Sequence, residues 1–202
     1  MAEGVQQWFA AVSHETGDLG EAWRADDFIE FGLGGNWAVN AKIESEIRIS
    51  DIYDDRTGFQ VGVLKAFALT DRASFALQAS LLGGEAVEGP ECQDTGLELR
   101  AALGTSFSLF GREGFVNAEA ANRSRGNCER QVMEIAAGLE FAPKWNLTLK
   151  AWDERGSGSL STKAEASIAR DIGAFRIGLG WREEISGKFE EKGLVASLRA
   201  TF

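Results

Sequence analysis

The stretch that decides the fold is residues 37–49, which read WAVNAKIESEIRI. Its apolar residues occupy alternate positions, and between them stand Asn40, Lys42, Glu44, Glu46 and Arg48. Successive side chains of a β-strand point to opposite faces, so this pattern predicts a strand with one apolar and one polar face. A helix of the same sequence would mix apolar and charged residues on every side.

The same alternation recurs along the whole chain. It is plain in residues 97–103 (LELRAAL) and in residues 175–182 (FRIGLGWR). The pattern predicts about twelve strands, at residues 5–15, 27–33, 37–49, 59–69, 74–84, 96–108, 114–123, 131–141, 145–155, 160–170, 174–185 and 193–202. Two alternatives stay open for residues 1–20, a first strand or a short helix inside a barrel lumen. Near Val63 and Leu64 the alternation slips, which indicates a β-bulge.

The predicted connections alternate between short and long. Short ones include Gly34-Gly35-Asn36 and Pro143-Lys144, and the longer, more polar ones are residues 16–26, 50–58, 85–95, 124–130, 156–159 and 186–192. In an up-and-down meander every second connection emerges at the same end. Tight turns at one end and long loops at the other are typical of a bacterial outer-membrane barrel. We therefore expect an all-β fold, a closed antiparallel up-and-down transmembrane β-barrel.

Composition narrows the class of protein. The 202 residues carry a net charge of −10, which argues against a nucleic-acid partner. A hydrophobic share of 44% is too high for a disordered chain. The longest apolar run is about five residues, far from the roughly 20 that a membrane-spanning helix needs. We expect a single barrel domain over residues 1–202, and because the first residues resemble no signal peptide, a mature or re-engineered start.

Alternation alone does not say which face points outward. The predicted strands are long, as membrane strands are, and a barrel of about twelve strands is too wide for a dry core of side chains. The polar face is rich in small residues and charges, which suits a wet lumen. These features favour apolar side chains facing lipid. The alternative is a soluble barrel or sandwich with the apolar face inside.

The last ten residues, GLVASLRATF, end in Phe202 with apolar residues at every second position before it, among them Leu198 and Ala200. This segment resembles the C-terminal signal of Gram-negative outer-membrane β-barrel proteins, the porin-like and small-channel class included. The resemblance implies a bacterial outer-membrane location, recognition by the barrel-assembly machinery and a periplasmic C-terminus. Outer-membrane lipid and lipopolysaccharide would then surround the barrel.

Cys92 and Cys128 are the only cysteines and fall in neighbouring long connections. Antiparallel pairing of strands 96–108 and 114–123 places Cys92 opposite roughly residues 129 to 131. We therefore expect a disulfide at the loop end of the barrel, the alternative being two separate thiols.

The predicted lumen is the best functional candidate. Its charged residues are expected to be Lys42, Glu44, Glu46, Arg48, Glu98, Arg100, Glu119, Glu134, Glu140, Lys150, Lys163, Glu165, Arg176, Arg182, Glu184 and Arg199. Strands six to eight would form a mostly acidic wall and strands nine to twelve a mostly basic one, and the resulting field would orient polar solutes. Alternatively, the charges pair with one another and plug the lumen.

No residue set predicts catalysis, a metal or a cofactor. Ser13 and His14 are adjacent in a strand and so point to opposite faces, which excludes a nucleophile–base pair. Asp51, Asp54 and Asp55 share a loop but do not follow a calcium-binding pattern.

The leading functional hypothesis is a narrow, charge-lined channel for the passage or binding of small polar solutes. The alternative is a non-conducting structural barrel whose loops engage an envelope or surface protein. An autotransporter-like translocator with a luminal helix in residues 1–20 comes third, and a hydrolytic enzyme last.

Overall fold

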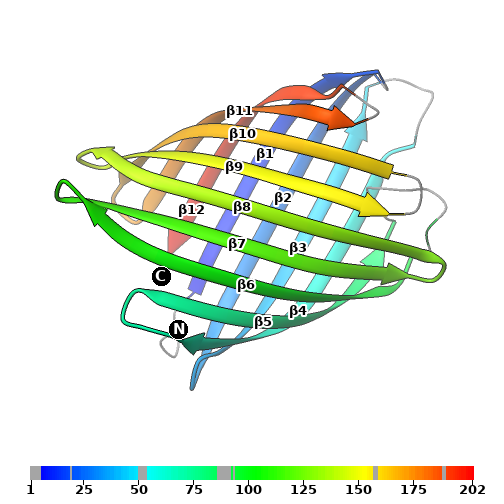
Figure 1. Cartoon of the computed structure of the whole chain (residues 1–202). Helices are drawn as coiled ribbons and strands as arrows, with labels where there is room; N and C mark the ends of the chain where they lie inside the picture. The colour runs from blue at the N-terminus through cyan, green and yellow to red at the C-terminus, as the bar shows by residue number, and fades with distance from the viewer. Residues whose placement is uncertain are drawn as a thin grey trace.

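A computed structural model describes residues 6–18, 20–49, 54–85, 92, 94–156, 159–187 and 190–202. Twelve strands form one closed barrel in which every strand pairs antiparallel with its sequence neighbours and β1 pairs with β12 (Figure 1). This confirms the predicted closed, all-β meander. Closure leaves no unpaired sheet edge, as a barrel in hydrocarbon requires.

The strands are β1 (Gln6–Gly17), β2 (Gly20–Gly34), β3 (Trp37–Arg48), β4 (Arg56–Ala68), β5 (Ala73–Gly84), β6 (Gly96–Leu109), β7 (Arg112–Arg125), β8 (Cys128–Ala142), β9 (Trp145–Gly156), β10 (Ser159–Ile172), β11 (Phe175–Gly187) and β12 (Lys192–Thr201). Gln6–Gly17 is therefore a strand rather than a luminal helix. No helix in the described part of the chain is long and apolar enough to cross a membrane.

Both chain ends lie where the tight turns are (Figure 1). The amide of Phe202 donates to the carbonyl of Gln6 at 2.9 Å, and the amide of Gln6 donates to the carbonyl of Phe202 at 3.2 Å. We call this end of the barrel the turn end and the opposite one the loop end.

Two predicted long connections are wrong. β2 begins at Gly20 and pairs with β1 up to Gly17, so the connection predicted at residues 16–26 shrinks to a tight turn. β7 likewise continues to Arg125 and β8 begins at Cys128. Both stretches are polar because their inward side chains are charged, and this polar composition led to their prediction as loops.

The bulge predicted near Val63 is also wrong. β4 pairs without a register shift with β3 and with β5. Leu64 is an apolar residue on the inward face and lines the lumen, which is why the alternation is interrupted there. Register shifts occur instead in β2, β8 and β10, between Gly32 and Gly34, Glu140 and Ala142, and Thr162 and Lys163.

The apolar face points outward. The side chains of Leu97, Leu99, Ile135 and Leu179 are 59%, 66%, 55% and 69% exposed, whereas Glu46 and Glu98 are each 1% exposed. An apolar outer surface around a polar interior suits lipid, so the soluble alternative is wrong and the fold is that of a membrane-spanning barrel.

A charged residue interrupts the apolar outer face midway along β2. Asp27 is exposed on β2, midway along the strand between Trp23 and Phe31. The indole Nε1 of Trp8 on β1 donates a hydrogen bond to Asp27 Oδ1 at 2.8 Å. A carboxylate facing hydrocarbon is unfavourable, and this bond offsets only part of its cost.

Candidate functional site

The barrel encloses an elongated cavity of about 850 Å³. Its lining includes Gln7 and Arg199 near the turn end and Arg48 and Arg56 near the loop end. The cavity therefore extends along most of the strand length.

The strand register puts the predicted lumenal residues on the inward face. Those that line the cavity are Lys42, Glu44, Arg48, Arg100, Glu119, Glu134, Lys150, Lys163, Arg182 and Arg199. The others make ion pairs or hydrogen bonds with neighbouring groups; they are Glu46, Glu98, Glu140, Glu165, Arg176 and Glu184.

Glu98 is the centre of a first charge network. Its carboxylate accepts a hydrogen bond from Arg100 Nε at 3.0 Å and pairs with Arg123 on the neighbouring strand. Arg100 also donates to Glu119 at 2.5 Å, and Gln60 donates to Glu98 at 3.1 Å. Glu98 and Arg100 each have oppositely charged partners in this network, which offsets the cost of burying their charges.

Facing this network on β3, Lys42 pairs with both Asp26 and Glu44. Arg123 of β7 interacts electrostatically with both Lys42 and Glu44. Charges on β3 and β7 therefore influence each other across the lumen.

Arg24 is the centre of a second network. Its guanidinium lies 3.4 Å from Glu15, 3.0 Å from Glu46 and 3.2 Å from Glu191. Glu191 precedes β12, is only 8% exposed, and also binds Lys163 at 2.5 Å. A residue of the β11–β12 connection therefore folds into the lumen.

Arg182 extends the second network along β11. It binds Glu15 and Glu165, each at 2.9 Å. The guanidinium also stands over the ring of Trp152, 5.1 Å from its centroid.

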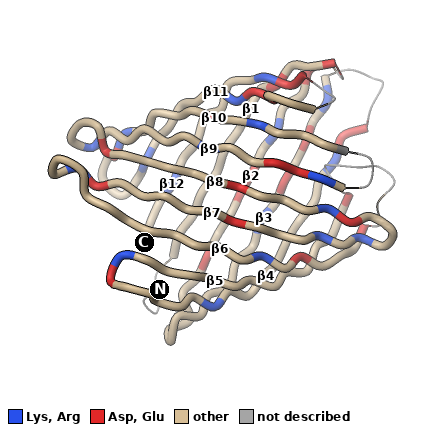
Figure 2. Tube along the Cα trace, in the orientation of Figure 1, with Lys and Arg blue, Asp and Glu red and all other residues tan. Residues whose placement is uncertain are grey.

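The prediction of one acidic and one basic wall is wrong. Figure 2 shows positive and negative residues interspersed along the strands. Neighbouring strands place opposite charges side by side, as in Lys150–Glu134 at 2.9 Å and Arg130–Glu154 at 3.1 Å. Such local pairing cancels most of a transverse field.

The prediction from sequence did not include several charged residues that face the lumen, among them Glu15, Arg24, Arg123, Arg130 and Glu191. Most of them fell in stretches predicted to be loops or at the edges of strands. Continuing the alternation of the flanking strands into those stretches would have found Arg24, Arg123 and Arg130.

A glycine on β4 allows polar side chains of β3 and β5 to form a hydrogen bond across it. Asn40 on β3 donates to Gln78 on β5 at 3.1 Å, although β4 lies between them. Gly62 of β4 stands at the crossing, where an added Cβ would come within 2.7 Å of Asn40 Oδ1.

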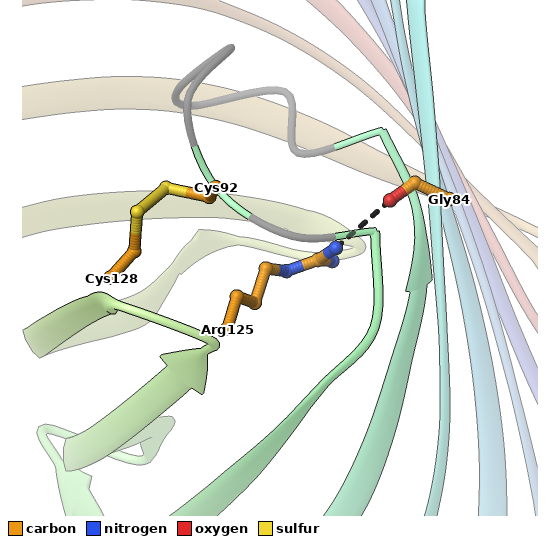
Figure 3. The surroundings of a disulfide bond; sticks show 4 residues. All are labelled: Gly84, Cys92, Arg125 and Cys128. Atoms are coloured by element: carbon orange, nitrogen blue, oxygen red, sulfur yellow. Dashed lines mark hydrogen bonds between the residues drawn. A yellow bond between two sulfur atoms is a disulfide. The ribbon is translucent and has the colours of Figure 1, made fainter.

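The disulfide is confirmed at the loop end (Figure 3). Cys92 and Cys128 are joined with a Cα–Cα distance of 5.5 Å, normal for such a bond. Beside it, Arg125 donates to the carbonyls of Gly84 at 2.9 Å and Asp94 at 3.2 Å. The bridge and this arginine together tie the β5–β6 connection to the β7–β8 turn.

The minor candidates take structural roles. Ser13 donates to Glu15 in the lumen, whereas His14 lies outside the barrel, 3.4 Å from Glu21. Asp55 accepts a hydrogen bond from the amide of Arg48, and Asp51 lies outside the described residues. Within the described ranges, no group of three acidic, His or Cys residues is placed to hold a metal ion.

Comparisons with known proteins identify the fold. No known protein-family profile and no curated protein sequence matches the chain. Among solved structures, the COG4313 outer membrane channel from Pseudomonas putida F1 matches 100% of this chain and 97% of its own, with a TM-score of 0.68 at 8% identity. The KdgM porin, solved with disordered oligogalacturonate, matches 96% and 99% of the two chains with a TM-score of 0.64 at 8% identity.

The NanC porin is similar to the same degree, covering 95% of this chain and 98% of its own with a TM-score of 0.65 at 8% identity. At such low identity the likeness concerns the fold, and it extends over the entire length of each barrel. The chain thus has the fold of the twelve-stranded channels of the Gram-negative outer membrane.

Proposed function

We propose that this protein is a narrow channel through which small polar solutes cross the outer membrane or in which they bind. The observation that carries the proposal is the cavity of about 850 Å³, which continues from residues near the turn end to residues near the loop end. A barrel that served only as a scaffold would need no continuous polar cavity.

The arrangement of charges supports passage of polar rather than strongly charged solutes. The lining carries charges of both signs, and most of them are neutralised by neighbours. Paired charges still offer donors and acceptors that replace part of a solute's hydration shell. Since most of these charges are paired, we expect weak discrimination between simple anions and cations.

Conductance of the purified barrel in planar bilayers tests the proposal, and we expect discrete single-channel currents. Lys42 and Glu44 line the cavity, so Lys42→Gln should shift the reversal potential in a salt gradient toward cation selectivity. Glu44→Gln should shift it toward anion selectivity. Arg170→Gln, which alters an outward arginine stacked on Trp145, is the matched control and should leave the potential unchanged.

A correctly folded barrel that gives no current would overturn the channel proposal. It would favour the second candidate, a non-conducting barrel that engages an envelope partner through its loops. The observation that favours this second candidate is that Glu191 inserts into the lumen and forms ion pairs with Arg24 and Lys163. Glu191→Ala separates the two candidates, because a channel narrowed by this residue gains conductance whereas a plugged scaffold stays silent.

A further inference from the structure

Two charged residues of the cavity lining stand apart from the ion-pair networks. Among the residues that the structure describes, Arg199 of β12 has no carboxylate partner. Within the described part of the chain, no cationic side chain pairs with Glu30 of β2, whose carboxylate lies beside the side-chain amide of Asn40. Every other charged residue of the lining takes part in an ion pair or another polar interaction.

Arg199 and Glu30 are close together in the barrel. Arg199 is in register with Phe9 of β1, and Glu30 is in register with Gln7 of the same strand. One strand separates the two residues, and they are offset by two residues along it, so their backbones lie about 12 Å apart. Long side chains from such positions leave room for a small molecule between their charged ends.

The surroundings suit a ligand with two opposite charges. The guanidinium of Arg199 stands 5.7 Å from the centroid of the Phe9 ring, which holds it against one wall of the lumen. Arg176 is in register with Arg199, but its own charge is satisfied by Asp171 at 2.6 and 3.0 Å. Arg199 is exposed to the lumen, whereas Glu30 is 8% exposed and offers a carboxylate in a largely dehydrated setting.

We propose that Arg199, Phe9 and Glu30 form a binding site for small zwitterionic solutes near the turn end of the lumen. The anionic group of the solute, such as a carboxylate, would bind the guanidinium in the two-pronged geometry that arginine favours. Its ammonium group would bind Glu30, and its carbon atoms would lie against Phe9. A molecule with both charges neutralises both residues at once, which a simple anion or cation cannot do.

The inference deepens the proposed function and rests on it for access of solutes to the lumen. Saturation-transfer NMR on the purified barrel in detergent tests it without any current. The probes are glycine, acetate and methylammonium, which carry both charges, the negative charge alone and the positive charge alone. We expect glycine to bind at least tenfold more tightly than either of the others.

Variants locate the site. Arg199→Gln and Glu30→Gln should each weaken glycine binding at least tenfold, while Arg199→Lys, which keeps the charge but loses the two-pronged geometry, should weaken it less than Arg199→Gln does. Arg170→Gln is the control, because Arg170 lies near the same end of the barrel but outside it. Heat-dependent migration on electrophoresis confirms that each variant is folded.

Three results would overturn the site: no saturable glycine signal, acetate binding as tight as glycine binding, or glycine binding unchanged in a folded Arg199→Gln variant. Glycine binding and ion conduction are measured independently, so the two proposals can be refuted separately. A barrel that conducts without binding glycine refutes the site alone, and one that binds glycine without conducting refutes the channel alone.

Discussion

Replacing Glu98 by glutamine should destabilise the barrel strongly. The Glu98 side chain is fully buried, while its partners Arg100 and Arg123 are 21% and 14% exposed. The substitution keeps the size of the side chain and the acceptor for Gln60, but it removes the negative charge that two arginines share. Folding then has to bury two positive charges without their common counter-ion.

The magnitude follows from these contacts. Removing one partner of a fully buried pair costs about 3–5 kcal/mol. Water in the lumen reaches both arginines, and Arg100 keeps its bond to Glu119, so the loss should fall at the lower end of that range. We expect Glu98→Gln to lower the free energy of unfolding by about 3 kcal/mol.

Urea unfolding in detergent micelles, followed by tryptophan fluorescence, measures this change. Glu21→Gln is the matched control, because Glu21 lies on the outer surface and its side chain is 56% exposed. The control should change the free energy of unfolding by less than about 0.5 kcal/mol. If Glu98→Gln is as stable as the control, the buried network does not hold the strands together and the reasoning fails.

Three further changes test the rest of the structure in the same assay. Replacing Cys92 and Cys128 together by serine should lower the free energy of unfolding by about 4 kcal/mol, because the bridge closes a loop of 36 residues; equal stability with and without reductant would contradict this. Asp27→Leu should raise it by about 1 kcal/mol, since an acid leaves the lipid-facing belt, and a loss of stability would show that the acid is needed there. Gly62→Ala should lower the free energy of unfolding by about 1–2 kcal/mol, because the added Cβ would push apart the hydrogen-bonded side chains of Asn40 and Gln78. Gly104→Ala, whose Cβ meets no atom closer than 3.9 Å, should leave it nearly unchanged. Similar values for the two variants would refute the crowding argument.

The strands and their orientation were predictable because their cause is local. In residues 37–49, alternation sorts side chains onto two faces without reference to any other strand. The disulfide was predictable for a related reason, since a hairpin with a known turn fixes which residues stand opposite each other. The start of β2 was missed because a lumenal strand segment such as residues 20–26 has the composition of a loop.

The pairing inside the lumen was not predictable. Arg24 binds Glu191, which is 167 residues away along the chain, and Arg182 binds Glu15 at the same separation. These contacts exist only because β1 closes against β12 and because the registers of all twelve strands together set which inward residues share a level.

By itself, the sequence determined that the chain forms a barrel of long strands, each with one apolar and one polar face, and it placed most of the side chains on these faces, since both depend on the two-residue period of a strand. Only the tertiary structure decided which lumenal charges neutralise each other and which, like Arg199 and Glu30, do not. Ion pairing depends on distances between residues of different strands, and those distances are set by the closure of the barrel.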